Sequence, residues 1–554
     1  MIAKDITVDE VPHSETVTKN IKQLPVTLLS GFLGSGKTTL LEHILKSPDH
    51  GLRIAVIVND MSTLNIDASL ISQHVVSNSK EKLIQLQNGC ICCTLRGDLL
   101  EELVRLARTD NVQYVVIEST GISEPMQVAE TFTTEFTEAM IEQGGFDDGQ
   151  TDNAIMKEIA DIGGLHKLAR LDTTVTVIDA FNFFTNFSTA DFLTDRWGKD
   201  AVTAEDERTI SDLLVDQIEF ADVIIVNKVD SIDAKTKARI LAICKKLNPS
   251  AKVIEASYSR IDVKEIVQTG MFSFEKAATG AGWLRSLHEL MQREVGGVMR
   301  IAPKPETEEY GISSFVYRAR RPFHPKRLFA LIQDKFIVLQ NVERDEDEDE
   351  DEEDENEDTE MGDEQEQTDE NGKDEDSEIE DEFEGMDFEE EIPSNVRLEN
   401  KRNHPAFSSM LRSKGFFWLA TRPQQHGEWS QAGGILTLQG GGPWFSVIDR
   451  SDWPDDPDVV KSIEADFQEP WGDRRQEIVF IGEHINEQAV TECFDKALLT
   501  TPEMRRWERI MRHKNLTDEE RDDKLAQYFE DGFEDWPKVA LDHDDEDGHI
   551  GHHH

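Results

Sequence analysis

Short apolar runs alternate with longer amphipathic stretches along the first half of the chain, from residue 24 to about residue 260. Apolar runs that are joined through helices are typical of a mainly parallel sheet that is covered on both faces. The sequence therefore predicts an α/β domain at residues 24–295. The runs expected to form its strands are 24–30, 53–59, 83–86, 114–118, 174–178, 223–226 and 253–255.

A second pattern begins near residue 305, where alternating apolar and polar positions predict a strand that is followed by a helix. A long charged stretch interrupts this pattern, and further strands and one helix are expected after it. This order of elements indicates a smaller C-terminal α+β domain, made of residues 305–342 and 392–505. Its expected strands are 312–318, 415–421, 434–438 and 478–482, and its expected helices are 326–334 and 487–498.

The 554-residue chain has a net charge of -54, and more than half of that charge lies in one segment. Residues 345–391 contain 31 acidic residues against one lysine. Such a composition cannot bury enough apolar surface to offset the entropy lost on ordering, so an acidic disordered insertion is expected at 343–391. The charge of the whole chain also argues against nucleic acid or an anionic membrane as the main partner.

The two ends of the chain are polar and are expected to lie outside the domains. Residues 1–23 are predicted to form a flexible N-terminal arm, and residues 506–554 a charged tail that contains histidines. Five cysteines in a chain of this length do not indicate a disulfide framework. Since no apolar stretch resembles a secretory signal or a membrane span, a location in the cytoplasm or nucleus is expected.

Residues 31–38 fit the phosphate-binding pattern G-x-x-x-x-G-K-[ST] and lie between a predicted strand and a predicted helix. Lys37 can reach the β- and γ-phosphates and Thr38 can ligate Mg²⁺, so both are candidate catalytic residues. A plain glycine turn is the alternative, which the strand-to-helix context disfavours. The residues expected to hold the phosphates are Gly31, Gly34, Ser35, Gly36, Lys37, Thr38 and Thr39.

Residues 227–230 match N-K-x-D at the end of a predicted strand. Asp230 can accept from both guanine N1–H and the exocyclic amine, whereas adenine would leave this carboxylate unpaired. The stem of Lys228 can lie against the base, and Asn227 can tie neighbouring loops together. The pattern favours GTP over ATP, although the same four letters also occur in ordinary turns.

An acidic residue and a glycine follow the strand predicted at 114–118. Glu118 closes this strand and Gly121 stands three residues later, the usual arrangement of a carboxylate that holds Mg²⁺ and of a switch glycine that senses the γ-phosphate. Glu118 is therefore a candidate catalytic and metal-site residue together with Thr38. A solvent-exposed strand-end glutamate is the alternative.

Three cysteines, Cys90, Cys92 and Cys93, stand within four residues after the strand predicted at 83–86. One disulfide cannot satisfy all three, and two or three thiolates suit Zn²⁺ or Cu(I), with Co²⁺ as an alternative. Three protein ligands leave a fourth position for another group, and an incomplete shell can exchange its metal. A redox pair or inert buried cysteines are the other interpretations.

Taken together, these motifs resemble those of the CobW family of GTPases. The resemblance rests on the phosphate loop, on residues 89–98 around the cysteines, on Glu118-Ser119-Thr120-Gly121 and on the N-K-x-D pattern. In the second half, Arg321-Pro322-Phe323-His324-Pro325 and residues 412–420 resemble the C-terminal domain of that family.

The resemblance implies a GTP-hydrolysing chaperone that binds GTP and GDP with Mg²⁺ and passes a divalent metal to a client protein. Zinc is the metal most often assigned in this family, while cobalt or iron would fit the branch that includes nitrile hydratase activators. The loop at 59–67 is closer to that branch, because Asp60 and Thr63 replace two glutamates of the family pattern. A nucleotide-switched scaffold with a structural metal and a P-loop kinase or ATPase are the competing hypotheses.

Overall fold

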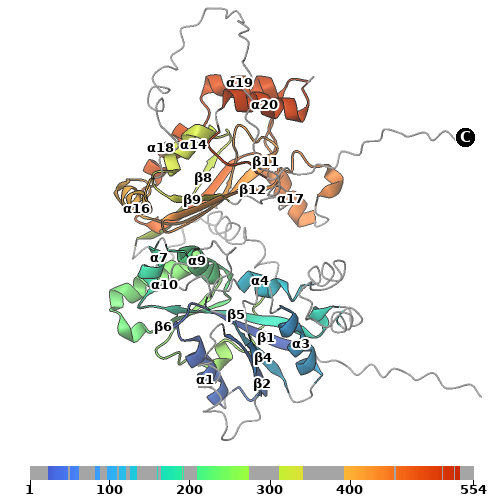
Figure 1. Ribbon diagram of the computed structural model, residues 1–554, viewed down its shortest axis with the longest axis vertical. Coiled ribbons are helices and arrows are strands. Elements are labelled where there is room, and N and C mark those ends of the chain that lie inside the picture. Colours follow the sequence, from blue (N-terminus) through green and yellow to red (C-terminus); the bar gives the residue numbers. More distant parts are fainter. Residues whose placement is uncertain are drawn as a thin grey trace, which may run out of the picture.

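The computed structural model (Figure 1) shows a chain that is folded into two domains. The described residues are 23–47, 50–60, 82–87, 96–108, 112–119, 121, 125–133, 159, 164–189, 191–192, 209–273, 311–340, 392–453, 457–514, 516–529 and 531–536. The predicted acidic insertion at 343–391 and residues 1–22 of the predicted arm lie outside them.

The first domain is an α/β unit with a seven-stranded sheet in the order β3-β2-β4-β1-β5-β6-β7, and every neighbouring pair of strands is parallel. Its strands are β1 (Leu24–Ser30), β2 (Ile54–Asp60), β3 (Lys82–Gln87), β4 (Tyr114–Glu118), β5 (Ala169–Asp179), β6 (Val223–Asn227) and β7 (Lys252–Glu255). Its helices are α1 (Lys37–Lys46), α3 (Arg96–Ala107), α4 (Pro125–Glu130), α7 (Phe183–Phe187), α9 (Ile210–Phe220) and α10 (Ala234–Leu247). The sheet predicted from the apolar runs is confirmed.

The strands are apolar on both faces because helices cover both faces of the sheet. On β1, Leu29 packs with residues of α1, whereas Val26 and Leu28 pack on the opposite face with residues of α3. Alternate side chains of a strand point to opposite faces, so a strand covered twice has few polar positions. This double burial explains why the strands could be predicted from continuous apolar runs.

The second domain has a six-stranded sheet in the order β8-β13-β10-β11-β12-β9, in which only the β12–β9 pair is parallel. Its strands are β8 (Ile312–Ala319), β9 (Ile337–Gln340), β10 (Met410–Phe417), β11 (Gln425–Ala432), β12 (Ile435–Pro443) and β13 (Gln476–Glu483). Its helices are α14 (Pro325–Ile332), α16 (Ser394–Asn403), α17 (Pro457–Asp466), α18 (Glu487–Ala497), α19 (Thr501–Met511) and α20 (Asp518–Tyr528). An α+β domain of this kind was predicted.

The strand predicted at 415–421 is displaced, because β10 begins earlier and ends at Phe417. Beyond it, the Trp418 backbone N–H donates to the Gln476 side chain at 2.9 Å instead of continuing the ladder of the sheet. Trp418 itself is fully buried beside Trp507 of α19. Trp418, Leu419 and Ala420 are apolar because they pack in the buried clusters between helices and sheet, and not because they form a strand.

Helix α19 crosses the boundary that the sequence placed between residues 505 and 506. The Trp507 indole is fully buried and donates from Nε1 to the Ala420 carbonyl at 2.8 Å. Leu525 and Phe529 of the following segment belong to the same buried cluster. Residues up to 536 therefore pack on the second domain. No helix among the described residues is long and apolar enough to cross a membrane.

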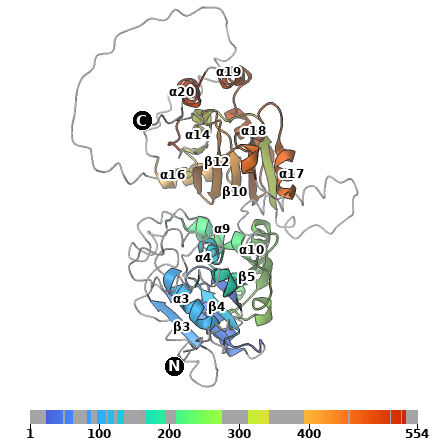
Figure 2. The same cartoon turned by 90° about the vertical axis from the view of Figure 1, so that its right-hand side faces the viewer.

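The two domains meet where α9 and α10 lie against the second sheet (Figure 2). The side chain of Arg412 on β10 is 1% exposed, and its guanidinium donates to both carboxylate oxygens of Glu219 on α9 at 3.0 and 3.2 Å. Arg239 of α10 donates to both oxygens of Glu483 on β13 at 2.9 Å, but this pair is about one-third exposed. Apolar side chains of both domains share one core cluster around these pairs.

We expect Arg412→Met to destabilise the protein by about 3 kcal/mol, because it leaves the Glu219 carboxylate, whose side chain is only 12% exposed, without its arginine partner. Urea denaturation of the full chain measures the loss. The matched control is Arg239→Met, which removes the more exposed pair with Glu483 and should cost under about 1 kcal/mol. Equal losses in the two variants would contradict the argument from burial.

Asp212 of α9 makes the stability of the folded protein fall as the pH rises, the opposite of the usual effect of a carboxylate. Burial raises the pKa of Asp212 to about 6 from 3.8, with repulsion from Asp216 and Glu219 in the same direction. The folded state therefore holds this proton more tightly than the unfolded state, so Asp212 costs stability that builds up as the pH rises from 3.8 to about 6 and is fully present above about 6. Asp212→Asn should add about 1 to 3 kcal/mol of stability at about pH 8, and the gain should vanish towards about pH 4.

Denaturation curves of the wild type and of Asp212→Asn across this pH range provide the measurement.

Glu503 is a comparison of opposite sign, because its contacts with Arg327 lower its pKa to about 2. Its contribution is present above the ordinary glutamate pKa and is lost as the pH falls towards 2, so Glu503→Gln should be destabilising near neutral pH. An Asp212→Asn variant no more stable than the wild type at about pH 8 would refute the assignment.

Candidate functional site

The phosphate-binding pattern forms a loop that leaves β1 at Ser30 and enters α1 at Lys37. Gly31 and Gly36 have φ angles of 131° and 109°. A Cβ on Gly31 would lie 2.3 Å from the Val177 carbonyl oxygen, and one on Gly36 would lie 2.3 Å from Asn227 Nδ2. Both the backbone conformation and the close packing therefore require glycine at these two positions.

The loop presents the groups that an anion needs. Helix α1 begins at Lys37 directly after the loop, and a helix start offers backbone N–H groups that can bind a phosphate. The Ser35 side chain is fully buried, and its hydroxyl has no hydrogen-bond partner among the described residues. Lys37 is 6% exposed and its ammonium donates to the Gly31 and Phe32 carbonyls at 2.6 and 3.2 Å. These groups fit a nucleotide phosphate.

The candidate magnesium residues come from the end of a strand and from the start of a helix. β4 ends at Glu118, which is paired in register with Leu29 of β1 and is buried. Thr38 stands in the first turn of α1, immediately after Lys37. A hydroxyl and a carboxylate are oxygen donors of the kind that Mg²⁺ prefers, so the donor set fits this ion. Gly121 lies against the loop, because a Cβ on it would be 2.5 Å from the Leu33 backbone nitrogen.

Asn227 joins the phosphate loop to the base-reading end of β6. Its Nδ2 donates to the Ser35 carbonyl at 2.8 Å and to Ser259 Oγ at 2.9 Å, and its Oδ1 accepts from the Ser259 backbone N–H at 2.9 Å. Ser259 Oγ in turn donates to the Gly36 carbonyl at 2.9 Å. One buried amide thus fixes the phosphate loop and the turn at Ser259, which are more than 200 residues apart in the sequence.

The other two residues of N-K-x-D lie at the open side of this edge. Asp230 is exposed within a 3-10 turn at Val229–Ser231, so its carboxylate is accessible to a base. Lys228 has a left-handed backbone, with φ of 61°, and its Nζ pairs with Asp179 Oδ2 at 2.7 Å. All these groups lie at the carboxyl ends of adjacent parallel strands, where ligands bind in open α/β sheets.

Two residues of this site were not predicted from the sequence. Ser259 follows β7 and Asp179 ends β5, so each stands at the carboxyl end of a strand next to β6. A polar residue directly after a predicted buried strand is the signal that could have identified Asp179. Ser259 stands four residues beyond its strand, and its contact with Asn227 depends on the turn of the intervening chain.

The predicted metal residues Cys90, Cys92 and Cys93 lie outside the described residues, between the end of β3 and the start of α3. The structure therefore does not test the predicted thiolate site. Within the described residues there is no group of three or more His, Cys, Asp or Glu side chains that could hold a metal. Cys244 of α10 is fully buried, and burial raises the pKa of its thiol to about 12, which makes it a packing residue.

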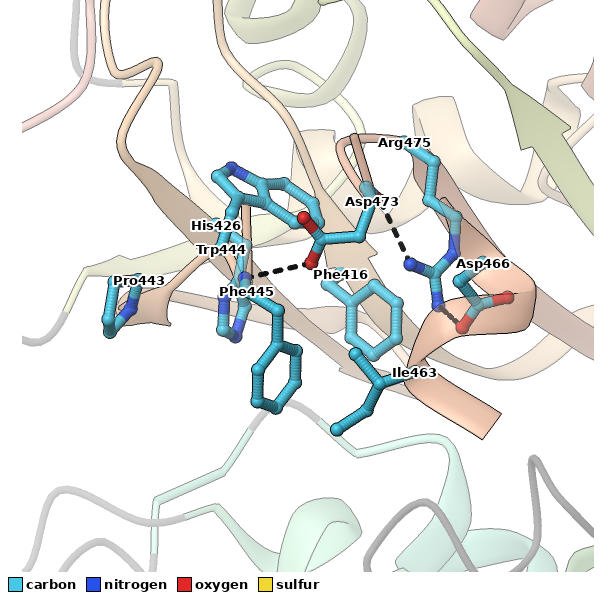
Figure 3. Close-up of a pocket in the computed structure, with 9 residues that line it drawn as sticks. All are labelled: Phe416, His426, Pro443, Trp444, Phe445, Ile463, Asp466, Asp473 and Arg475. Carbon is cyan, nitrogen blue, oxygen red and sulfur yellow. Dashed lines mark hydrogen bonds and ion pairs between the residues drawn. The ribbon is translucent and has the colours of Figure 1, made fainter. Parts of the chain in front are cut away.

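A cavity of about 160 Å³ lies in the second domain (Figure 3). Asp473 accepts from the Phe445 and Ser446 backbone N–H groups, and Arg475 pairs with Asp466 at 2.9 Å. Because these charged groups already have partners and the other walls are mainly apolar, the cavity does not resemble a phosphate site. It is lined by Phe416, His426, Pro443, Trp444, Phe445, Ile463, Asp466, Asp473 and Arg475.

Comparison with known proteins gives two family matches. Residues 25–148 and 134–255 match the model of the CobW/HypB/UreG nucleotide-binding domain. Residues 395–498 match the model of the cobalamin synthesis protein cobW C-terminal domain. The first match contains the phosphate loop and N-K-x-D, and the second covers most of the second sheet.

Similar proteins are named as zinc-linked GTPases or chaperones. Zinc-regulated GTPase metalloprotein activator 1 of Dictyostelium discoideum is 35% identical over 495 residues, which are 88% of this chain and 82% of that protein. Zinc chaperone CobW of Pseudomonas aeruginosa is 31% identical over 248 residues, 43% of this chain and 58% of that protein. The crystal structure of the Zn(II)-bound YjiA GTPase from E. coli aligns with 86% of this chain and 100% of that chain at 16% identity, with a TM-score of 0.27.

We expect Asn227→Ala to weaken the binding of a fluorescent GDP analogue at least about tenfold, because the two loops lose their common tie. Asn248→Ala is the matched control, since Asn248 is another buried amide of this domain that donates to the Ile218, Glu219 and Ala221 carbonyls. This control should lower the unfolding temperature but leave nucleotide affinity unchanged. A loss of affinity in both variants would indicate a general effect on folding.

Proposed function

This chain belongs to the CobW/HypB/UreG family of P-loop proteins, and from that premise we propose that it is a GTP-hydrolysing metallochaperone that transfers zinc to a client protein. One observation carries the nucleotide part of the proposal: the Asn227 amide holds the phosphate loop and the base-reading strand end together as one site. The metal part rests on the three clustered cysteines and on the zinc-linked names of the relatives.

The base-reading end of the site favours guanine. Asp230 is exposed beside Lys228, and its carboxylate can accept two hydrogen bonds from guanine. Adenine offers an acceptor at N1 and has no amine at C2, so it would leave a carboxylate facing a lone pair. An adenine-specific kinase or ATPase is therefore the weaker candidate.

The phosphate end supplies charge stabilisation for hydrolysis. The Lys37 ammonium and the backbone N–H groups of the loop are placed to balance negative charge that develops on the γ-phosphate. Thr38 and Glu118 would hold Mg²⁺, which supplies neutralising charge beside the β- and γ-phosphates when it is bound. No glutamine of the described loop is placed to orient the attacking water, so slow intrinsic hydrolysis is expected, which metal or client accelerates.

The proposed zinc site belongs to the residues between β3 and α3. β3, β2, β4 and β1 are parallel neighbours, so β3 ends at the same edge of the sheet as β1, which leads into the phosphate loop. We propose that Cys90, Cys92 and Cys93 hold zinc as cargo, and that exchange of GTP for GDP changes the affinity of these thiolates. The client is a protein that requires the metal.

Separate substitutions distinguish the two parts of the proposal. Lys37→Ala should abolish GTP hydrolysis, measured as phosphate release, while one zinc ion still binds. Replacing Cys90, Cys92 and Cys93 with serine should abolish tight zinc binding and leave GDP affinity unchanged. Unchanged zinc stoichiometry in the serine variant would refute the thiolate site.

The coupling between nucleotide and metal needs its own measurement. Zinc and cobalt affinities are compared for the full chain loaded with a non-hydrolysable GTP analogue and with GDP. We expect zinc to bind with different affinity in the two states, because the switch residues lie at the same sheet edge. Equal affinities in both states would favour a structural metal in a nucleotide-switched scaffold.

A further inference from the structure

The carboxylate of Asp179 lies directly beside the residue pair that begins N-K-x-D. Asp179 is the last residue of β5, and it is paired in register with Asn227 on β6. The Ala180 backbone N–H donates to the Asn227 carbonyl at 3.0 Å, which extends the pairing by one residue. The position of Asp179 is therefore set by the sheet itself and not by a flexible loop.

Three donors converge on this carboxylate. Asp179 Oδ2 accepts from Lys228 Nζ at 2.7 Å and from Asn182 Nδ2 at 2.8 Å, while Oδ1 accepts from the Phe181 backbone N–H at 3.0 Å. The Asp179 side chain is 7% exposed, whereas the Lys228 side chain is 36% exposed. The lysine is thus anchored at its charged end by a buried acid, and part of its side chain remains open to the surface.

We propose that Asp179 is a positioning residue for the guanine base, acting through Lys228. The anchored ammonium fixes the direction of the lysine side chain, so that its hydrocarbon stem forms a preformed surface against which the base lies. This inference rests on the proposed guanine-nucleotide function and adds to it a residue that lies outside the N-K-x-D pattern.

The anchor is needed because Lys228 is otherwise poorly constrained. A lysine side chain loses up to about 2 kcal/mol of conformational entropy when it is ordered, and without Asp179 that loss would fall on nucleotide binding. The backbone of Lys228 is already held in the left-handed region, with φ of 61°. Since the ion pair exists before the base arrives, the ordering cost is met during folding, as preorganisation requires.

A purely structural role for Asp179 makes a different prediction. The hydrogen bonds from Phe181 and Asn182 only shape the turn that leads into α7, and they do not involve the lysine. If these bonds were the whole function of Asp179, replacing it would change GDP affinity by the same factor whether or not residue 228 carries a charge. A double-mutant cycle separates the two roles.

The experiment measures the affinity of the full chain for a fluorescent GDP analogue in four proteins: wild type, Asp179→Asn, Lys228→Met and the double variant. Asparagine keeps the acceptor for the Phe181 N–H and removes the charge, while methionine keeps most of the stem and removes the ammonium. We expect Asp179→Asn to weaken binding about tenfold in the wild-type background and less than about twofold in the Lys228→Met background.

Asp262→Asn is the matched control, because Asp262 also accepts a backbone N–H from two residues ahead, that of Lys264, but forms no ion pair with a lysine ammonium within the part of the chain that the structure describes. It should leave GDP affinity unchanged. An equal loss from Asp179→Asn in both backgrounds, or tighter binding in that variant, would overturn the positioning role while the guanine site stands. A wild-type chain that binds no guanine nucleotide would overturn the proposed function and this inference together.

Discussion

The buried amide of Asn227 is the contact on which the nucleotide site depends. It reaches from the end of β6 to the Ser35 carbonyl in the phosphate loop and to Ser259 after β7. The amide also packs tightly against the phosphate loop, since any side chain on Gly36 would collide with it. Phosphate loop and base-reading strand are distant in sequence, so their relative position is set by this amide and by the parallel register of the sheet. A buried amide with all its hydrogen bonds made specifies such a geometry more sharply than apolar packing does.

The first domain could be predicted from the sequence because its strands are buried on both faces and its loops need particular residues. The phosphate loop requires glycines at positive φ, and these appear at fixed spacing. The resemblance to the CobW family, which the comparisons confirm, rested on the same constraints. Asp179 was not found, because its role depends on which strand lies next to β6, and strand order is a property of the fold and not of a local pattern.

The second domain was predicted less completely, for a different physical reason. Strand β11 is the sequence QHGEWSQA, in which polar side chains are buried through hydrogen bonds instead of apolar contacts. Gln431 is fully buried and donates to the Gly433 carbonyl, while its oxygen accepts from Ser413. Such a strand lacks apolar alternation, and β9, α16 and α17 are too short or too polar to be distinguished from loops. The second half of helix α19 was assigned to a charged tail because the buried Trp507 stands among arginines and acids.

Helix α9 belongs to both halves of the molecule. Its last turn carries Glu219, which holds Arg412, and its apolar side chains share a core with Val479 and Ile481 of the other sheet. Only two residues separate the end of α9 from the start of β6, which leads to the guanine-reading residues. A cut between residues 273 and 311 would separate the two domains. It would expose the apolar side chains of α9 to water and leave Glu219 without Arg412. We therefore expect the nucleotide-binding half to self-associate through this exposed apolar surface when it is separated from the second domain.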